Sequence, residues 1–139
     1  MSLLILPVLV HMALVLALVM TVGMLRYRAV QSRQVRIGAI ALSNDAWPVP
    51  VRKFSNNLAN QFETPIIFYG LVAIAVYAGI ETVLTTICAW GYVLSRFAHT
   101  TVHVTTNHIF HRFLAFATGV AFLVVMLGRI VVGLIPQLV

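Results

Sequence analysis

The chain has 139 residues, of which 61% are hydrophobic and only 9% are charged, and its mean hydropathy is +1.01. Soluble domains average roughly 45–50% apolar and about 25% charged residues, so this composition excludes a soluble globular domain. The formal charge of +6 does not indicate nucleic-acid binding, because the basic residues are mostly arginines that flank apolar segments. The single cysteine, Cys88, excludes an intrachain disulfide, and its apolar neighbours predict a packed thiol.

Four apolar segments follow one another along the chain, over about residues 3–25, 51–80, 81–107 and 113–132. A membrane-spanning helix needs roughly 20 apolar residues, so four spans and their connections use the whole length. The first segment lacks a basic leader and a small-residue cleavage site, which predicts a retained span and not a signal peptide. We therefore expect an all-α membrane protein, a single four-transmembrane-helix bundle formed by residues 1–139.

The connection between the first two segments carries most of the positive charge. Residues 26–53 hold six of the nine Lys and Arg residues, whereas the turn around Glu81 holds none. Because cytoplasmic loops are enriched in Lys and Arg, we expect this connection to be cytoplasmic and both termini to lie outside. Within it, Trp47-Pro48-Val49-Pro50 cannot be helical throughout, since each proline disfavours the helical conformation in the residue before it.

Polar residues gather at the segment ends that this topology places on the cytoplasmic side. Helical spacing predicts one face with Asn56, Asn60 and Glu63, a second with Arg96, His99, His103 and Asn107, and Arg112 at the start of the fourth segment. Ionisable groups at membrane depth normally pair, so we expect Glu63 to pair with Arg96 and Arg112. The surplus of guanidinium charge favours an anionic ligand, and the alternative is that these groups only tie helices together or meet lipid headgroups.

Four histidines lie close together in the sequence, at His99, His103, His108 and His111. Two histidines four residues apart on a helix can bind one metal ion, so a metal or haem protein is a further hypothesis. Neighbouring arginines oppose a cation, and Glu63 is the only carboxylate at hand to complete such a site. The sequence therefore favours an anion over a metal.

Three motifs occur in order at predicted helix ends, and together they resemble a known family. They are Asn60-Gln61-Phe62-Glu63-Thr64-Pro65, Arg96-Phe97-Ala98-His99-Thr100 and the isolated Arg112, with a weaker fourth segment at Gln34-Val35-Arg36. The first is similar to an Asn-x-x-Glu signature that begins a second helix, and the next to an Arg-x-x-His-Thr motif that ends a third. The third, Arg112, has the spacing of a catalytic arginine at the start of a fourth helix. The family is that of the membrane-associated proteins in eicosanoid and glutathione metabolism (MAPEG).

The resemblance implies a homotrimer of four-helix subunits with glutathione, as co-substrate, held between neighbouring subunits near the cytoplasmic face. Carried over by residue, the glutathione ligands are Asn60, Glu63, Arg96 and His99, with Arg112 as the catalytic residue that stabilises the thiolate and Arg36 as a contact to a glutathione carboxylate. Asn56 and His103 fall at two further ligand positions, where the family usually has arginine and tyrosine.

Three hypotheses about function follow. The first is a glutathione-dependent transferase or peroxidase acting on lipophilic electrophiles that dissolve in the membrane lipids. The second, favoured by Asn56 and His103, is a non-catalytic lipid- or anion-binding membrane protein on the same scaffold. The third is the histidine-ligated metal or haem protein.

Overall fold

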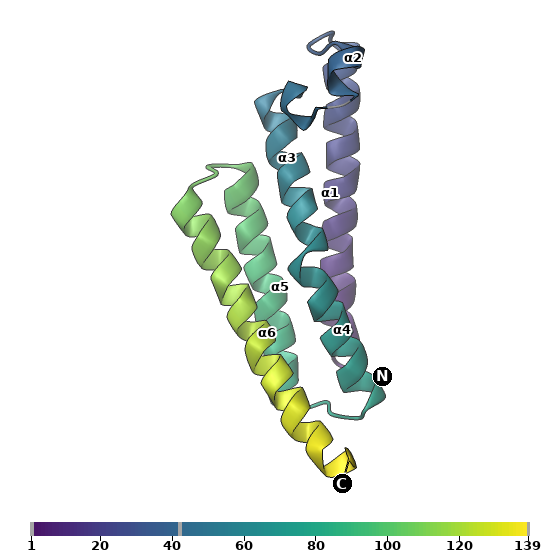
Figure 1. Cartoon of the computed structure of the whole chain (residues 1–139), viewed down its shortest axis with the longest axis vertical. Helices are drawn as coiled ribbons and strands as arrows, with labels where there is room; N and C mark the ends of the chain where they lie inside the picture. Colours follow the sequence, from purple (N-terminus) through teal and green to yellow (C-terminus); the bar gives the residue numbers. More distant parts are fainter. Residues whose placement is uncertain (1, 42, 139) are drawn as a thin grey trace.

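The computed structural model describes residues 2–41 and 43–138, and every regular element within them is helical. The elements, labelled in Figure 1 where there is room, are α1 (Ile5–Gln31), α2 (Ile37–Ile40), η1 (Asn44–Ala46), α3 (Val49–Ala59), η2 (Asn60–Phe62), α4 (Thr64–Tyr77), α5 (Val83–Val104) and α6 (Ile109–Leu138). The predicted all-α class is confirmed.

The longer helices form two neighbouring groups. α5 and α6 run antiparallel and share the most extensive contacts among the described elements, while α1 packs beside α3 and α4 (Figure 1). Contacts of α5 with α1 and α3, and of α6 with α4, join the two groups. Both termini lie at one end of the bundle, and α2 and η1 lie at the other.

The first helix is longer than the predicted span. It continues to Gln31 instead of ending at residue 25, because tertiary contacts hold its polar last turns. Arg26 donates a hydrogen bond from Nη2 to Ser55 Oγ over 3.1 Å, and its guanidinium lies over the Trp47 ring at 5.3 Å from the centroid. The helix is closed by Arg33, which has a φ of 55°, the left-handed conformation common just after helix C-termini.

The second predicted span is interrupted. α3 ends at Ala59, η2 follows, and α4 begins at Thr64, so that Glu63 lies outside helical conformation at φ −92° and ψ −93°. Pro65 stands in the first turn of α4, where it cannot donate the backbone hydrogen bond that a continuous helix would need. The prediction that Asn56, Asn60 and Glu63 share one face of a single helix is therefore wrong.

Three helical stretches of the described chain are long and apolar enough to cross a membrane, namely Ile5–Gln31, Val49–Tyr77 and Ile109–Pro136. α5 does not meet this measure, because its second half is polar, although its 22 residues give a length of about 33 Å. α5 and α6 replace the predicted ranges 81–107 and 113–132 with slightly different ends. A reciprocal pair of hydrogen bonds between Thr82 and Thr85 fixes where α5 begins.

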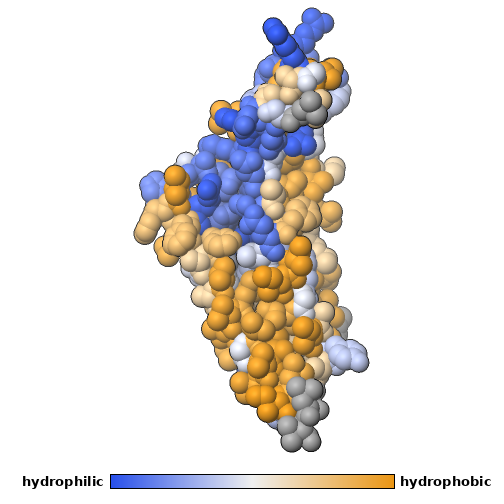
Figure 2. Space-filling model, viewed as in Figure 1, coloured by the Kyte–Doolittle hydropathy of each residue, from blue (hydrophilic) through white to orange (hydrophobic). Residues whose placement is uncertain are grey.

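The surface separates into a polar end and an apolar body, which Figure 2 shows as blue and orange regions. The polar end carries α2, η1, α3 and the turn between α5 and α6. Large apolar side chains are exposed along the body, among them Leu16 at 65%, Ile66 at 62% and Val124 at 62%. An exposed apolar surface of this extent belongs in lipid or against another protein. Together with the three apolar helices, it identifies an integral membrane protein.

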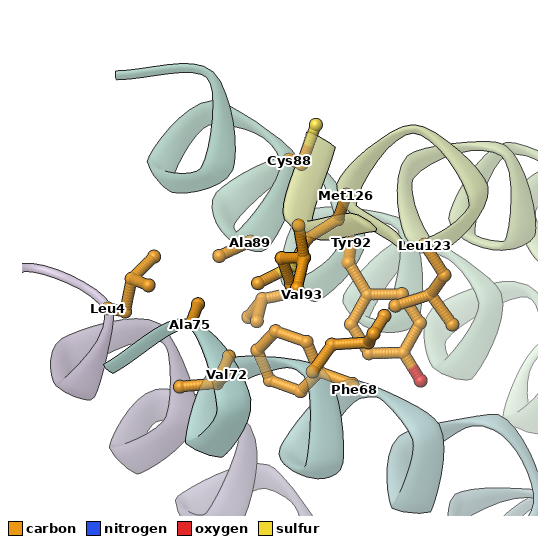
Figure 3. Packing of buried hydrophobic residues seen from close by; sticks show 12 residues of the cluster. Leu4, Phe68, Val72, Ala75, Cys88, Ala89, Tyr92, Val93, Leu123 and Met126 are labelled. Atoms are coloured by element: carbon orange, nitrogen blue, oxygen red, sulfur yellow. The ribbon is translucent and has the colours of Figure 1, made fainter. Parts of the chain in front are cut away.

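The buried core lies where α4, α5 and α6 meet, and Figure 3 shows its packing. Phe68 and Tyr92 stack at its centre with ring centroids 4.7 Å apart. Cys88 is part of this cluster at 2% exposure, which confirms the prediction of a packed thiol. α5 and α6 approach closely at Gly119, where an added Cβ would lie 2.5 Å from Ser95 Oγ. Small residues at such crossings allow membrane helices to pack backbone against backbone.

Candidate functional site

Two pockets lie side by side at the polar end of the bundle, between the start of α6 and the helices α3 and α5. The first, here called the polar pocket, has a volume of about 290 Å³. Its wall includes Arg52, Lys53, Asn56, His103, Asn107 and Arg112, together with Asn44, Asp45 and Val49. Three of these side chains carry fixed positive charge and one carries negative charge. The polar pocket is therefore suited to an anion.

The second pocket, here called the aromatic pocket, has a volume of about 250 Å³. It is lined by Asn60, His99, Ile109, Arg112, Phe113 and Phe116. Ile109 and Phe113 are exposed at 74% and 64%, so this pocket opens onto the apolar surface of α6.

Arg112 belongs to the walls of both pockets. It lies in the first turn of α6, directly after the turn that joins α5 to α6. Asn107 makes this turn possible by adopting a φ of 53°, a left-handed conformation that asparagine tolerates better than most residues. The same asparagine accepts a hydrogen bond from Arg112 Nη1 to its Oδ1 over 2.8 Å. The turn thus both places and orients the guanidinium.

Arg96 lies behind these pockets and lines neither of them, with only 1% of its surface exposed. It donates from Nη2 to the backbone oxygen of Asn60 over 3.1 Å and from Nε to Gln61 Oε1 over 3.4 Å. The guanidinium therefore holds η2, the short helix in the interruption, against α5. In the single chain Arg96 supports the wall that carries Asn60 instead of facing a ligand itself.

A buried polar network that we did not predict surrounds Arg96. Gln61 donates through Nε2 to Asn57 Oδ1 and to Thr100 Oγ1, each over 3.4 Å. Asn57 is fully buried and Gln61 is 2% exposed. One feature of the sequence could have indicated this network. Asn57 and Gln61 are four residues apart, as are Arg96 and Thr100, so each pair can lie on one face of a helix. We predicted that Asn56 would face the interior, but Asn56 is exposed and the next residue, Asn57, is buried.

Glu63 does not pair with Arg96 or Arg112 as predicted. Within the described residues the salt bridge formed is the one between Arg52 Nη1 and Asp45 Oδ1 at 3.3 Å, and Glu63 lies exposed at the interruption. The physical reason is the non-helical conformation of Glu63, which removes it from the face that the predicted helix would have presented.

His99 and His103 are brought to the two pockets by consecutive turns of α5. Each is 3% exposed, and their rings lie 5.6 Å apart between centroids. The Nδ1 atom of each ring is buried without a hydrogen-bond partner. His103 faces the polar pocket and His99 the aromatic pocket, where its ring centroid is 6.3 Å from that of Phe116. Unsatisfied buried nitrogens of this kind are available to a ligand.

The remaining predicted positions fall outside this arrangement. Arg36 is exposed just before α2 and lines neither pocket. His108 and His111 form a separate exposed pair with ring centroids 4.5 Å apart. Within the described residues, no three His, Cys, Asp or Glu side chains come together to hold a metal ion. The geometry therefore gives no support to the metal hypothesis.

The comparison with protein families matches residues 4–132 to the MAPEG family, which is nearly the whole chain. No curated protein and no solved structure matches the chain.

Proposed function

We propose, because this chain belongs to the MAPEG family, that it is a glutathione-dependent transferase acting on lipophilic electrophiles in the membrane. Membership places it among the membrane proteins of glutathione and eicosanoid metabolism. The observation that carries the finer proposal is the position of Arg112, whose side chain lines both the cationic polar pocket and the aromatic pocket, which opens onto the apolar surface of α6. A hydrophilic thiol in the first and a lipophilic electrophile in the second would meet at this residue.

Arg112 would act on the protonation of the thiol. A free thiol has a pKa near 8.5, so most of it is protonated at pH 7, and an adjacent guanidinium lowers the pKa of the thiol by stabilising the thiolate. The thiolate sulfur would attack the electrophilic carbon, forming a C–S bond while the bond to the leaving group breaks and its electron pair departs with that group. The thiol proton would go to water in the polar pocket.

The other predicted ligands divide between the two pockets. Asn56 and His103 lie in the polar pocket with Arg112, whereas Asn60 and His99 lie in the aromatic pocket. Histidine Nδ1 atoms without partners and asparagine amides can hydrogen-bond the backbone of a tripeptide. In the single chain the two pockets are open to the outside, and the two histidines lie buried in their walls.

Assembly as a homotrimer is part of the proposal. Arg36 and Glu63 are exposed in the single chain, so a neighbouring subunit can contact them, and Glu63 would then bind the ammonium group of glutathione. We further propose that α5 is a fourth crossing, shielded by its neighbours, with residues 26–53 cytoplasmic and both termini outside. Native mass spectrometry from detergent tests the assembly, and stable monomers or dimers alone would contradict it.

Glutathione binding by calorimetry, ultraviolet absorbance of the bound thiolate and conjugation of a small aromatic electrophile test the chemistry. Replacing Arg112 with Ala should lower kcat by about ten- to a hundred-fold, the loss expected for one charged hydrogen bond, with a smaller effect on binding. Arg129→Ala on the same helix is the matched control, since Arg129 lines neither pocket.

Two outcomes would refute parts of this proposal. A folded Arg112→Ala protein with full activity would remove the catalytic role of Arg112. Wild-type protein that binds glutathione but forms no thiolate and no conjugate would leave the alternative, a non-catalytic anion-binding membrane protein, for which the cationic polar pocket is the supporting observation.

A further inference from the structure

The polar pocket holds more positive charge than thiolate stabilisation by Arg112 requires. Arg52 and Lys53 on α3 contribute two further cations to its wall, and Asp45 is the only acid there, which leaves a net charge of two positive units before any histidine is counted. We propose that Arg52 and Lys53 form a carboxylate subsite for the anionic co-substrate, and that Asp45 occupies this subsite when the co-substrate is absent. The proposal rests on the proposed function, because it names how the same co-substrate is held.

The position of Arg52 is suited to this role. It precedes Asn56 by four residues, so both side chains lie on one face of α3 and line the same pocket. Asn56 is short and neutral and cannot attract a carboxylate by charge, whereas a guanidinium can bind one through two parallel hydrogen bonds. Arg52 uses only one such bond, from Nη1 to Asp45 Oδ1 at 3.3 Å, and its side chain is 38% exposed.

Lys53 is held in place by a contact with the end of α5. Its Nζ donates to the backbone oxygen of Thr105 over 2.8 Å, which ties α3 to the end of α5. Within the described residues this is the hydrogen bond recorded for Lys53 Nζ, so two of the three hydrogens of the ammonium group are left for other acceptors. Arg112 likewise donates from Nη1 to Asn107, and among the described residues the rest of its guanidinium remains available.

A second observation points independently to a ligand in this pocket. His103 lines the pocket at 3% exposure, and its Nδ1 has no partner among the described residues. A buried polar atom without a partner costs free energy that a bound polar group would recover. The cationic side chains and the His103 side chain line the same space of about 290 Å³.

Asp45 has the geometry of a replaceable counter-ion. Its side chain is 91% exposed, it meets Arg52 through a single oxygen, and its backbone is fixed by a hydrogen bond from Asp45 N to Ser43 Oγ. An exposed ion pair of this kind contributes little to stability, about 0–1 kcal/mol. An incoming carboxylate can therefore displace it, and removing the Asp45 charge should favour the ligand.

The test compares glutathione with its diester, which lacks both carboxylate charges, by calorimetry on the detergent-solubilised protein. Replacing Arg52 with Gln should weaken glutathione binding by about ten- to a hundred-fold and leave diester binding within about three-fold. Lys53→Gln should act in the same direction. Asp45→Asn should tighten glutathione binding by several fold, an effect that damage to the fold cannot produce.

Arg28→Gln is the matched control, because it removes one positive charge from an exposed position on α1 that lines neither pocket. Equal losses for Arg28→Gln and Arg52→Gln, or equal losses for glutathione and its diester, would overturn the subsite. Weaker binding in Asp45→Asn would overturn the competition.

Failure of the proposed function gives a different result. If the wild type binds no glutathione, that function fails, and the pocket is titrated with glutarate as a simple dicarboxylate. Tighter binding in Asp45→Asn than in the wild type, and weaker binding in Arg52→Gln, would support the subsite on its own. No binding of glutarate would overturn it as well.

Discussion

The closeness of α5 and α6 at Gly119 can be tested with a single methyl group. A Cβ at this position would lie 2.5 Å from Ser95 Oγ, far inside van der Waals contact, and Ser95 has little freedom to move because its hydroxyl donates to the Tyr92 backbone oxygen over 2.6 Å. We therefore expect Gly119→Ala to force the two helices apart locally.

The magnitude follows from two opposing terms. Overpacking of a well-packed interior costs about 1–3 kcal/mol, and alanine in place of glycine within a helix gains about 0.5–1 kcal/mol. Gly128 lies on the same helix, and a Cβ added there would have no atom within 4 Å, so Gly128→Ala should show only the gain. The difference in unfolding free energy between the two alanine variants, about 1–3 kcal/mol, is then the steric cost alone.

The assay is reversible unfolding of the detergent-solubilised protein with increasing sodium dodecyl sulfate, followed by circular dichroism. The hydroxyl oxygen is the atom responsible, since Ser95 Cβ would lie at an ordinary 3.6 Å. Adding Ser95→Ala should therefore restore most of the stability that Gly119→Ala removes. If Gly119→Ala were as stable as Gly128→Ala, or if Ser95→Ala gave no recovery, the close approach of α5 and α6 would be wrong.

Two further predictions concern the buried network and the topology. Gln61→Leu should lower the unfolding free energy by about 2 kcal/mol in the same assay, because Arg96 Nε loses its charged hydrogen bond. Gln61→Glu keeps an acceptor for Arg96 and should lower the unfolding free energy less. Equal effects of the two substitutions would argue against this contact. Cysteines introduced at Ser43 and at the exposed Glu81 should label from opposite sides of intact cells, with Ser43 reacting from the cytoplasm, and the buried Cys88 provides the unreactive background. Labelling of Ser43 only from outside would reverse the proposed orientation.

The helices themselves were largely predictable, because apolar runs and proline positions depend on local sequence. The prolines keep the segment from Trp47 to Pro50 from being helical throughout, as expected, although α3 begins at Val49, two residues before the predicted span. The end of α1 was not predictable from apolarity, because the contacts of Arg26 with Ser55 and Trp47 keep a polar segment helical. Such contacts exist only after folding.

The candidate site was predictable in its residue types but not in its geometry. The prediction that Arg112 lies near Asn56 and His103 is confirmed, because the polar helix ends that carry them meet at the same end of the bundle. Treating residues 51–80 as one helix gave Glu63 the wrong direction, because Glu63 itself, two residues before Pro65, has a non-helical conformation that reorients its side chain. The roles of Asn57 and Gln61 depend on which side of α3 faces α5, and the polar sequence around them offers several equivalent faces.

The sharing of Arg112 by two pockets has a thermodynamic consequence. One guanidinium cannot give its full set of hydrogen bonds to two occupants independently, so a molecule in the polar pocket changes the affinity of the aromatic pocket. The coupling free energy is the same in either direction, and a ligand that draws Arg112 toward itself alters the other site by an equal factor. The order in which the two ligands bind then changes the free energy of each binding step but not the total free energy of binding both.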